Sequence, residues 1–241
     1  AVTFDTASLV TDRTFTTDSV DWDVSEAWTM WQKYRTPDLK DLIQEIVDRP
    51  GWQAQNAIAL IFRGEDQGAS SDDNARDMES FENIEDPDDG GDGLNHPERI
   101  PKLYIYFSVD TELDTTRIAQ TGLDGSTPIS SDDVEQINNE MDKLYDDDLD
   151  AGWEGDDFNI VTVGMRFRGV LVPQGATIDS AFVEIYAHED ETDLAKITVF
   201  GEASDNAVTF DTASLVTDRT FTTDSVDWDV SEAWTMWQKY R

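Results

Sequence analysis

The sequence contains no cysteine and only two histidines among its 241 residues. The absence of cysteine excludes disulfides and thiolate metal sites, so stability must come from packing, with bound ions as the supplement that we expect. The histidines, His96 and His188, do not form a spaced cluster, which argues against a transition-metal centre. Neither a disulfide scaffold nor a zinc-type site is therefore predicted.

Basic residues are also scarce, with 17 Lys and Arg against 53 Asp and Glu and a formal net charge of −36. Such a charge makes nucleic acid and anionic membrane surfaces poor partners. It also repels itself, and that repulsion must be lowered by screening salt or by bound cations. No apolar run reaches the roughly 18 residues that a spanning helix requires, so no membrane span is predicted.

Apolar and aromatic residues are plentiful despite the charge. Hydrophobic residues make up 38% of the chain, which includes eight Trp, eleven Phe and six Tyr. Disordered chains lack this much apolar surface, whereas a single domain of this size needs it for a core. The sequence therefore predicts a folded protein.

A long internal repeat is the strongest feature of the sequence. Residues 1–35 and residues 207–241 are identical, 206 positions apart. A fixed period is typical of repeat proteins, and a period of this length corresponds to a whole domain. The sequence leaves open whether the overlap is natural or was introduced. We expect the chain to be a window, cut out of register with its domains, onto an extracellular or cell-surface tandem array whose export signal lies upstream.

Alternating apolar residues predict short β-strands. Residues 162–168 place Val163, Met165 and Phe167 on one face, and a Pro-Gln-Gly turn precedes a second strand at residues 180–187. Further strands are expected at residues 20–23, 57–63, 102–108 and 196–201. One helix is expected, with Thr36 as its N-cap and Pro37 at its first position. The predicted fold is all-β, a jelly-roll-like β-sandwich with one short helix, in a tandem array of 206-residue units.

A stretch rich in Thr, Asp and Gly divides the chain. Residues 109–128 are predicted to be an interdomain linker. Residues 1–108 are then the C-terminal part of one sandwich unit, and residues 129–241 are the N-terminal part of the next. On this interpretation, each half needs the adjoining copy to complete its core.

Four segments resemble a known family. VGMRFRGVLVPQGATIDSAFVEIYA (163–187), ITVFGEASDNAVTF (197–210), RTPDLKDLIQEIVDRPGW (35–52) and PKLYIYF (101–107) resemble the DNRLRE or disaggregatase-related β-sandwich repeat domains of large bacterial or archaeal surface proteins. The order matches only when the chain is read from residue 131 through the duplicated segment and on to residue 108. The resemblance implies a jelly-roll-like sandwich, often repeated in adhesins and often holding structural calcium. This sequence departs from it by an insertion at residues 85–99.

Clusters of carboxylates suggest a calcium site, because calcium takes six to eight hard oxygen ligands from flexible loops. None of the clusters matches an EF-hand loop. For any single aspartate, a solvated acidic surface is the competing interpretation. The resemblance favours the first two acidic groups, and we predict metal ligands among Asp132, Asp133, Glu135, Asp146, Asp148 and Asp150, with Asp86, Asp88 and Asp92 as a weaker alternative.

The tryptophans admit two interpretations. They either pack in the core and between domains, which the composition of a sandwich favours, or form a platform on which sugars stack. Trp28 and Trp31, within EAWTMWQKY, are predicted to pack between copies. The tryptophans considered are Trp22, Trp28, Trp31, Trp52 and Trp153.

No motif for catalysis rises above chance, and we predict that the protein is not an enzyme. The first hypothesis is a calcium-stabilised structural repeat unit of an extracellular filament, stalk or adhesin, whose partners are copies of itself. The alternative is a carbohydrate-binding, lectin-like module for polysaccharide, in which repetition adds avidity. Buried Trp28 and Trp31 would favour the first, and exposed aromatics beside Asn, Asp or Arg would favour the second.

Overall fold

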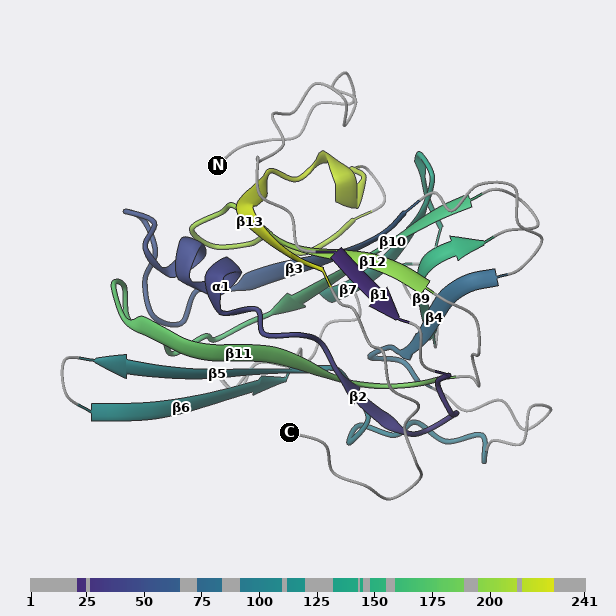
Figure 1. Ribbon diagram of the computed structural model, residues 1–241, viewed down its shortest axis with the longest axis horizontal. Helices are drawn as coiled ribbons and strands as arrows, with labels where there is room; N and C mark the ends of the chain where they lie inside the picture. Colours follow the sequence, from purple (N-terminus) through teal and green to yellow (C-terminus); the bar gives the residue numbers. More distant parts are fainter. Residues whose placement is uncertain are drawn as a thin grey trace.

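We describe the fold from a computed structural model of the chain (Figure 1). The structure describes residues 21–24, 27–65, 73–83, 92–109, 112–119, 132–142, 144, 148–154, 159–188, 195–211 and 214–227. For residues 21–24 and 112–119, only the backbone is considered.

The described residues form two antiparallel sheets, which confirms the predicted all-β sandwich. The four-stranded sheet has the order β2 (Lys33–Arg35), β11 (Thr177–Tyr186), β5 (Lys102–Val109) and β6 (Glu112–Ala119). The nine-stranded sheet contains β1 (Asp21–Val24), β12 (Ala195–Glu202), β3 (Ile58–Gly64), β10 (Asn159–Phe167), β7 (Asp133–Ile137), β8 (Glu140–Met141), β13 (Phe221–Asp227), β9 (Asp148–Glu154) and β4 (Asp73–Glu79).

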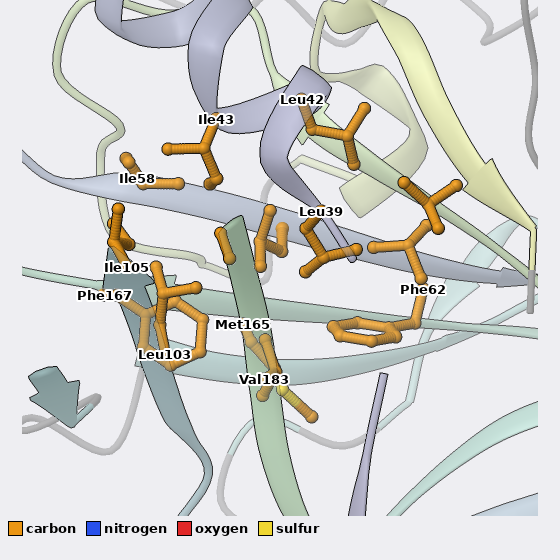
Figure 2. Packing of buried hydrophobic residues seen from close by; sticks show 14 of the residues in the cluster. Leu39, Leu42, Ile43, Ile58, Phe62, Leu103, Ile105, Met165, Phe167 and Val183 are labelled. Carbon is orange, nitrogen blue, oxygen red and sulfur yellow. The ribbon is translucent and has the colours of Figure 1, made fainter. Parts of the chain in front are cut away.

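The main core lies between the two sheets (Figure 2). Val163, Met165 and Phe167 of β10 are all buried there, so the face predicted from their alternation is confirmed. They meet apolar residues of the opposite sheet, such as Leu103 and Val183. Burying a side chain of this size stabilises the fold by about 1.5–3 kcal/mol, which makes this layer the main source of stability.

A second, smaller core covers the outer face of the nine-stranded sheet. The segment that follows β12 folds back over the sheet and places Phe210 and Val216 against Ile61 and Val134. Gly164 permits this contact, because a Cβ there would lie 2.6 Å from the Phe210 ring. The outer face of the sheet is thus covered by residues of the second copy of the repeat.

Arg219 fastens this covering segment. Its guanidinium lies 3.9 Å from the centre of the Phe210 ring and donates to the carbonyls of Val208 and Thr209 at 2.8 and 2.9 Å. It also pairs with Glu202 at the end of β12. A cation satisfied in this way is stable in a buried position, where Arg219 is only 4% exposed.

The single helix of the described residues, α1 (Lys40–Val47), begins later than predicted. Thr36 is not its N-cap: the Thr36 hydroxyl accepts a hydrogen bond from the N–H of Val183 and donates to the Pro37 carbonyl. Asp38 accepts from the N–H of both Lys40 and Ala181. These bonds tie residues 36–38 to β11, so the helix starts only after them. The apolar residues of the helix, Leu42, Ile43, Ile46 and Val47, are buried.

The prediction of a linker at residues 109–128 is wrong for residues 112–119. Glu112–Ala119 forms β6, and every residue of β6 is paired with a residue of β5. Both halves of the chain also contribute to the same sheet. Strands β1, β3 and β4 come from the first half, and β10 of the second half pairs with β3 of the first. In this chain, the two halves complete one sandwich.

Candidate functional site

The two copies of the repeat meet on one strand, β12. One edge of β12 pairs with β3, and the other pairs with both β1, from the first copy, and β13, from the second. Asp21 and Asp227 are equivalent positions of the repeat, and both are paired with Thr198. From that residue, β13 runs along β12 in one direction and β1 in the other (Figure 1).

The register of the two strands on β12 is the same. In β13, Val226 is opposite Val199, and in β1, Trp22 is opposite Ile197. Trp22 is equivalent in the repeat to residue 228, which directly follows Asp227. The two strands therefore occupy the positions of one longer strand without a shift.

The rest of the repeat divides in the same way. The second copy supplies the described residues 207–211 and 214–220, which cover the outer face of the sheet, and β13, which pairs with β12 within the sheet. The first copy supplies β2 and the buried pair Trp28 and Tyr34, whose rings stack at 4.5 Å. Arg76 lies over the Trp28 ring, 5.7 Å from its centre. Between them, the described residues of the two copies account for positions 1–5, 8–24 and 27–35 of the repeated segment.

A group of carboxylates on β4 and β9 is a candidate metal site. Carboxylate oxygens of Asp77, Asp148 and Asp150 lie within 4.8 Å of one another. Asp77 is opposite Asp150 in the strand pairing, and all three side chains point away from the core that contains Met78 and Leu149. Two of the three, Asp148 and Asp150, are predicted ligands. Asp77 is an addition that only the pairing of β4 with β9 reveals.

The other predicted ligands on β7 and beside it have protein partners. Asp132 is paired with Arg166 and Arg168 at 2.6 and 2.8 Å. Glu135 accepts a hydrogen bond from the N–H of Asp150 at 2.7 Å. Burial raises the pKa of Asp132, and the two guanidiniums oppose that rise. These residues join β7 to its neighbours, and the structure does not bring them into the group on β4 and β9.

The weaker alternative site is only partly described. Asp86 and Asp88 lie outside the described residues, as does Asp146 of the first two acidic groups. Asp92 is exposed and contacts His96 at 3.1 Å, and His96 contacts Glu98 at 3.0 Å through its other ring nitrogen. Hydrogen bonds from the imidazole to the carboxylates of Glu98 and Asp92 raise the pKa of His96. Asp92 thus takes part in an exposed pair within the insertion.

Asp133 is the most unusual titratable group among the predicted ligands. It is 2% exposed, and its Oδ2 accepts a hydrogen bond from the N–H of Phe81 at 2.8 Å. Burial raises its pKa well above the usual value, and the nearby charges of Glu82 and Asp132 raise it further. An aspartate in an unfolded chain ionises near pH 3.9, so folding holds a proton on this group at a higher pH.

We expect Asp133→Asn to become more favourable as the pH rises. With a raised folded pKa, the contribution of Asp133 to stability falls as the pH rises from about 4 through the folded pKa, at no more than about 1.4 kcal/mol per pH unit. Asparagine avoids this cost and still accepts from Phe81. Urea unfolding at pH 5 and pH 7.5 should show a larger gain for the variant at pH 7.5. A pH-independent difference between the variant and the parent chain would contradict the burial argument.

Three of the tryptophans considered as a sugar platform are in the core. Trp28, Trp52 and Trp153 are 1%, 1% and 3% exposed, and Trp52 donates to the carbonyl of Val172. Trp31 is half-buried with φ 61°, and Arg99 lies over its ring. The side chain of Trp22 lies outside the described residues. Core packing is therefore confirmed for the three buried rings, and packing between copies stays a prediction for Trp28 and Trp31.

A different set of aromatic rings lies on the outer face of the four-stranded sheet. Phe182 stacks on Tyr104 at 5.1 Å and lies 6.3 Å from Tyr106, and the Arg35 guanidinium is 4.4 Å from its ring centre. Glu184 binds Lys33, Arg35 and the Tyr104 hydroxyl. Burial works to raise the pKa of Glu184, but Lys33 and Arg35 outweigh it and lower the pKa. The sequence alone did not predict this face, because its residues come from β2, β5 and β11, and only the pairing of these strands brings them together.

Comparisons with protein-family models, with curated proteins and with solved structures find no match to this chain. The resemblance to the DNRLRE-type domains therefore stays a prediction. Among the described residues, no helix is long and apolar enough to cross a membrane.

Proposed function

We propose that this chain carries one sandwich unit of an extracellular or cell-surface repeat protein, such as a filament, stalk or adhesin. The observation that carries the proposal is the common register of β13 and β1 on β12. A strand that ran on from Asp227 into residues 228–230 would take the positions of β1 without a shift, because the residues are the same. One period of the sequence therefore corresponds to one sandwich.

This register also supports the frame of the unit. A unit that begins near β7 would run through the second copy of the repeat and on into the equivalents of α1, β3, β4, β5 and β6. Its β13 and β1 would then be one strand, and residues 120–131 would connect one unit to the next. The family resemblance has the same permuted order, which is an independent reason to favour this frame.

A rearranged chain tests the frame. Residues 132–241 joined directly to residues 36–119 keep the Arg-Thr junction that the sequence has at residues 35 and 36. We expect a monomer that unfolds cooperatively and is at least as stable as the 241-residue chain, because the strand on β12 is now unbroken. A chain of four periods should appear as a row of four particles in negative-stain electron microscopy. A rearranged chain without cooperative unfolding would contradict the proposal.

We infer a structural role in preference to a catalytic one. A hollow between α1 and β13 is lined by polar residues, and three of them, Glu45, Asp48 and Arg49, hold the helix in place. Glu45 accepts from the N–H of Asp224, Asp48 accepts from Gln44, and Arg49 is paired with Asp205. Paired carboxylates that serve as acid and base need an open cleft between them. The side chains of this hollow are instead engaged with their own neighbours.

Calcium at Asp77, Asp148 and Asp150 would neutralise most of the charge of this one group, and so lower the local repulsion in a chain with a net charge of −36. Three half-buried carboxylates on two paired strands offer hard oxygen ligands, and water would complete the coordination shell. Extracellular modules of this kind bind calcium with dissociation constants of about 0.1–1 mM. Binding would tie β4 to β9 at one end of the nine-stranded sheet.

We expect 10 mM calcium to raise the melting temperature by about 5–10 °C. This corresponds to about 2.7 kcal/mol for a ligand at 100 times its dissociation constant. Asp150→Asn should lose most of the gain, whereas Asp179→Asn, with the same charge change on β11 of the other sheet, should keep it. Differential scanning calorimetry at constant ionic strength measures both. An equal gain from magnesium or sodium would indicate screening and not a site.

Carbohydrate binding is the second candidate function, and the outer face of the four-stranded sheet favours it. Stacked aromatic rings beside Arg35 and Glu184 combine an apolar surface with charged groups that bind hydroxyls. Affinity electrophoresis in gels with neutral or acidic polysaccharide tests it. A sugar site would be supported if polysaccharide in the gel slows the migration of the parent chain and of Leu171→Ala, a control at an exposed position. The migration of Phe182→Ala should not be slowed. Equal mobility in all gels would remove this candidate.

A further inference from the structure

The edge of β12 that the two repeat copies share is a surface on which a second copy of this chain fits. We propose that separate chains exchange halves at this edge and assemble head to tail, the first half of one chain completing the sandwich with the second half of another. The inference deepens the proposed function and rests on it, because it names the partner that completes each unit.

The first step of the argument is that the sandwich is already made of two parts. β3 pairs with β10 and β12, β4 pairs with β9, and β1 pairs with β12, so the first half of the chain contacts the second over four strand pairs of the nine-stranded sheet. β11 of the second half lies between β2 and β5 of the first half in the other sheet. Each half therefore supplies strands to both layers, and neither half has its layers complete without the other.

The second step is that the closed and exchanged forms contain the same contacts. In the closed form, residues 120–131 lead from β6 back to β7 of the same sandwich. In the exchanged form, they lead to β7 of the next sandwich. Only this connection differs, which is the condition under which domain swapping costs little free energy. The contact is heterologous, since the first half of one chain meets the second half of the next, and such contacts generate open chains or rings.

The third step concerns specificity. The strand that β12 accepts is fixed by register, with Asp23 opposite Lys196 and Trp22 opposite Ile197. A strand edge left open by exchange would pair with other chains without selection. The repeated sequence provides the matching strand in every copy, and the side chains that follow it, Trp28 and Tyr34, fill a buried position of the core. A second copy of this chain is thus the partner that the edge selects.

Concentration decides between the two forms. Because residues 120–131 join the two halves of one chain, each half meets its own partner at an effective concentration on the order of 1 mM. We therefore expect closed monomers when the chain refolds at about 1 µM and head-to-tail assemblies when it refolds near 1 mM. Because exchange requires the halves to separate, mixing chains that are already folded should produce little exchange.

Two single-cysteine variants test the proposal, since the natural chain has no cysteine to interfere. Directly opposite residues of antiparallel strands have Cα atoms about 4.5–5.5 Å apart, within the range that a disulfide bridges. Asp23→Cys and Lys196→Cys chains of different tagged lengths are refolded together at about 1 mM and oxidised. We expect a disulfide between the two chains after refolding together and none after mixing folded chains.

The matched control is the pair Ser108→Cys and Leu113→Cys. These residues are opposite each other in β5 and β6, which belong to the same half of the chain. Head-to-tail exchange never brings them together from two chains, so no mixed disulfide is expected. Mixed disulfides in both pairs would indicate unspecific association and would overturn the proposal, as would their absence from the first pair at every concentration.

The double variant Asp23→Cys/Lys196→Cys separates this inference from the proposed function. At about 1 µM it should form a disulfide within one chain, which reports the register of β1 on β12. If this internal disulfide forms while the mixed one does not, the sandwich unit stands and only exchange between chains is wrong. If the internal disulfide also fails, the register that carries the proposed function is wrong as well.

Discussion

Replacing Trp28 and Trp234 together with alanine is expected to destabilise the chain by about 3–5 kcal/mol, whereas either replacement alone should cost less than about 1 kcal/mol. The two residues are equivalent in the repeat. Trp28 is 1% exposed and stacks on Tyr34, so its removal leaves a large cavity. Residues 228–241 have the same sequence and follow β13 directly, and they offer a second tryptophan for the same position.

Trp52 provides the matched control, because it is equally buried and has no equivalent in a second copy. Trp52→Ala alone should cost the full 3–5 kcal/mol. Urea unfolding of the four variants and the parent chain gives the coupling between Trp28 and Trp234 as a double-mutant cycle. If Trp28→Ala is as costly as Trp52→Ala, and Trp234→Ala adds nothing, the position belongs to the first copy alone and the two copies do not substitute for each other.

Gly64→Ala is expected to be the most damaging small substitution, with a cost of about 3 kcal/mol or more. A Cβ at this position would lie 1.8 Å from the carbonyl oxygen of Gly152, which is backbone and cannot rotate away. β3 and β9 would have to separate, and the core between them would loosen. Overpacking a filled interior typically costs 1–3 kcal/mol, and a backbone clash leaves fewer ways to relax.

Gly175→Ala is the control for this substitution. Gly175 has a φ of 71° in a turn, and nothing lies within 4 Å of an added Cβ. Its cost comes from the left-handed backbone alone, about 1–2 kcal/mol. Thermal unfolding should therefore show a drop in melting temperature for Gly64→Ala that is clearly larger than the drop for Gly175→Ala. Equal drops would mean that β3 and β9 do not approach so closely.

The sequence was sufficient for strands with a simple pattern. Five strands were predicted close to their observed bounds: β3, β5, β10, β11 and β12. Within each of these strands, apolar residues alternate or follow one another, and turn residues separate one strand from the next. β4 and β9 were not predicted as strands. They are rich in Asp, Asn, Ala and Glu, which have low strand propensity. The pairing of β4 with β9, and of β9 with β10, holds them in the sheet.

The start of the helix shows why local signals were insufficient there. Thr36 and Pro37 have the residue types of an N-cap and a first helical position, but Thr36 and Asp38 instead form hydrogen bonds with Val183 and Ala181 of β11. β11 lies more than 140 residues away in the chain. A tertiary contact of this kind overrides a local preference worth about 1 kcal/mol.

The candidate metal site was predicted in part for a similar reason. Asp148 and Asp150 alternate with the core residues Leu149 and Ala151, so their position on an outward face follows from the sequence. Asp77 joins them only through the register of β4 on β9. Asp132, in contrast, looked like a calcium ligand because its two arginines at positions 166 and 168 are distant in sequence.

The meeting of the two copies at Asp21 and Asp227 leaves the path of the backbone degenerate. Moving the point of crossover along the repeated segment exchanges each residue for an identical one, so side-chain chemistry does not fix where one copy gives way to the other. If the crossover moved in this way, the folded state would be a family of chain traces of nearly equal free energy that share one set of atomic positions. Strand displacement of this kind proceeds one residue at a time, as branch migration does between identical nucleic-acid strands. It would give the repeated residues two sets of amide resonances that interconvert slowly.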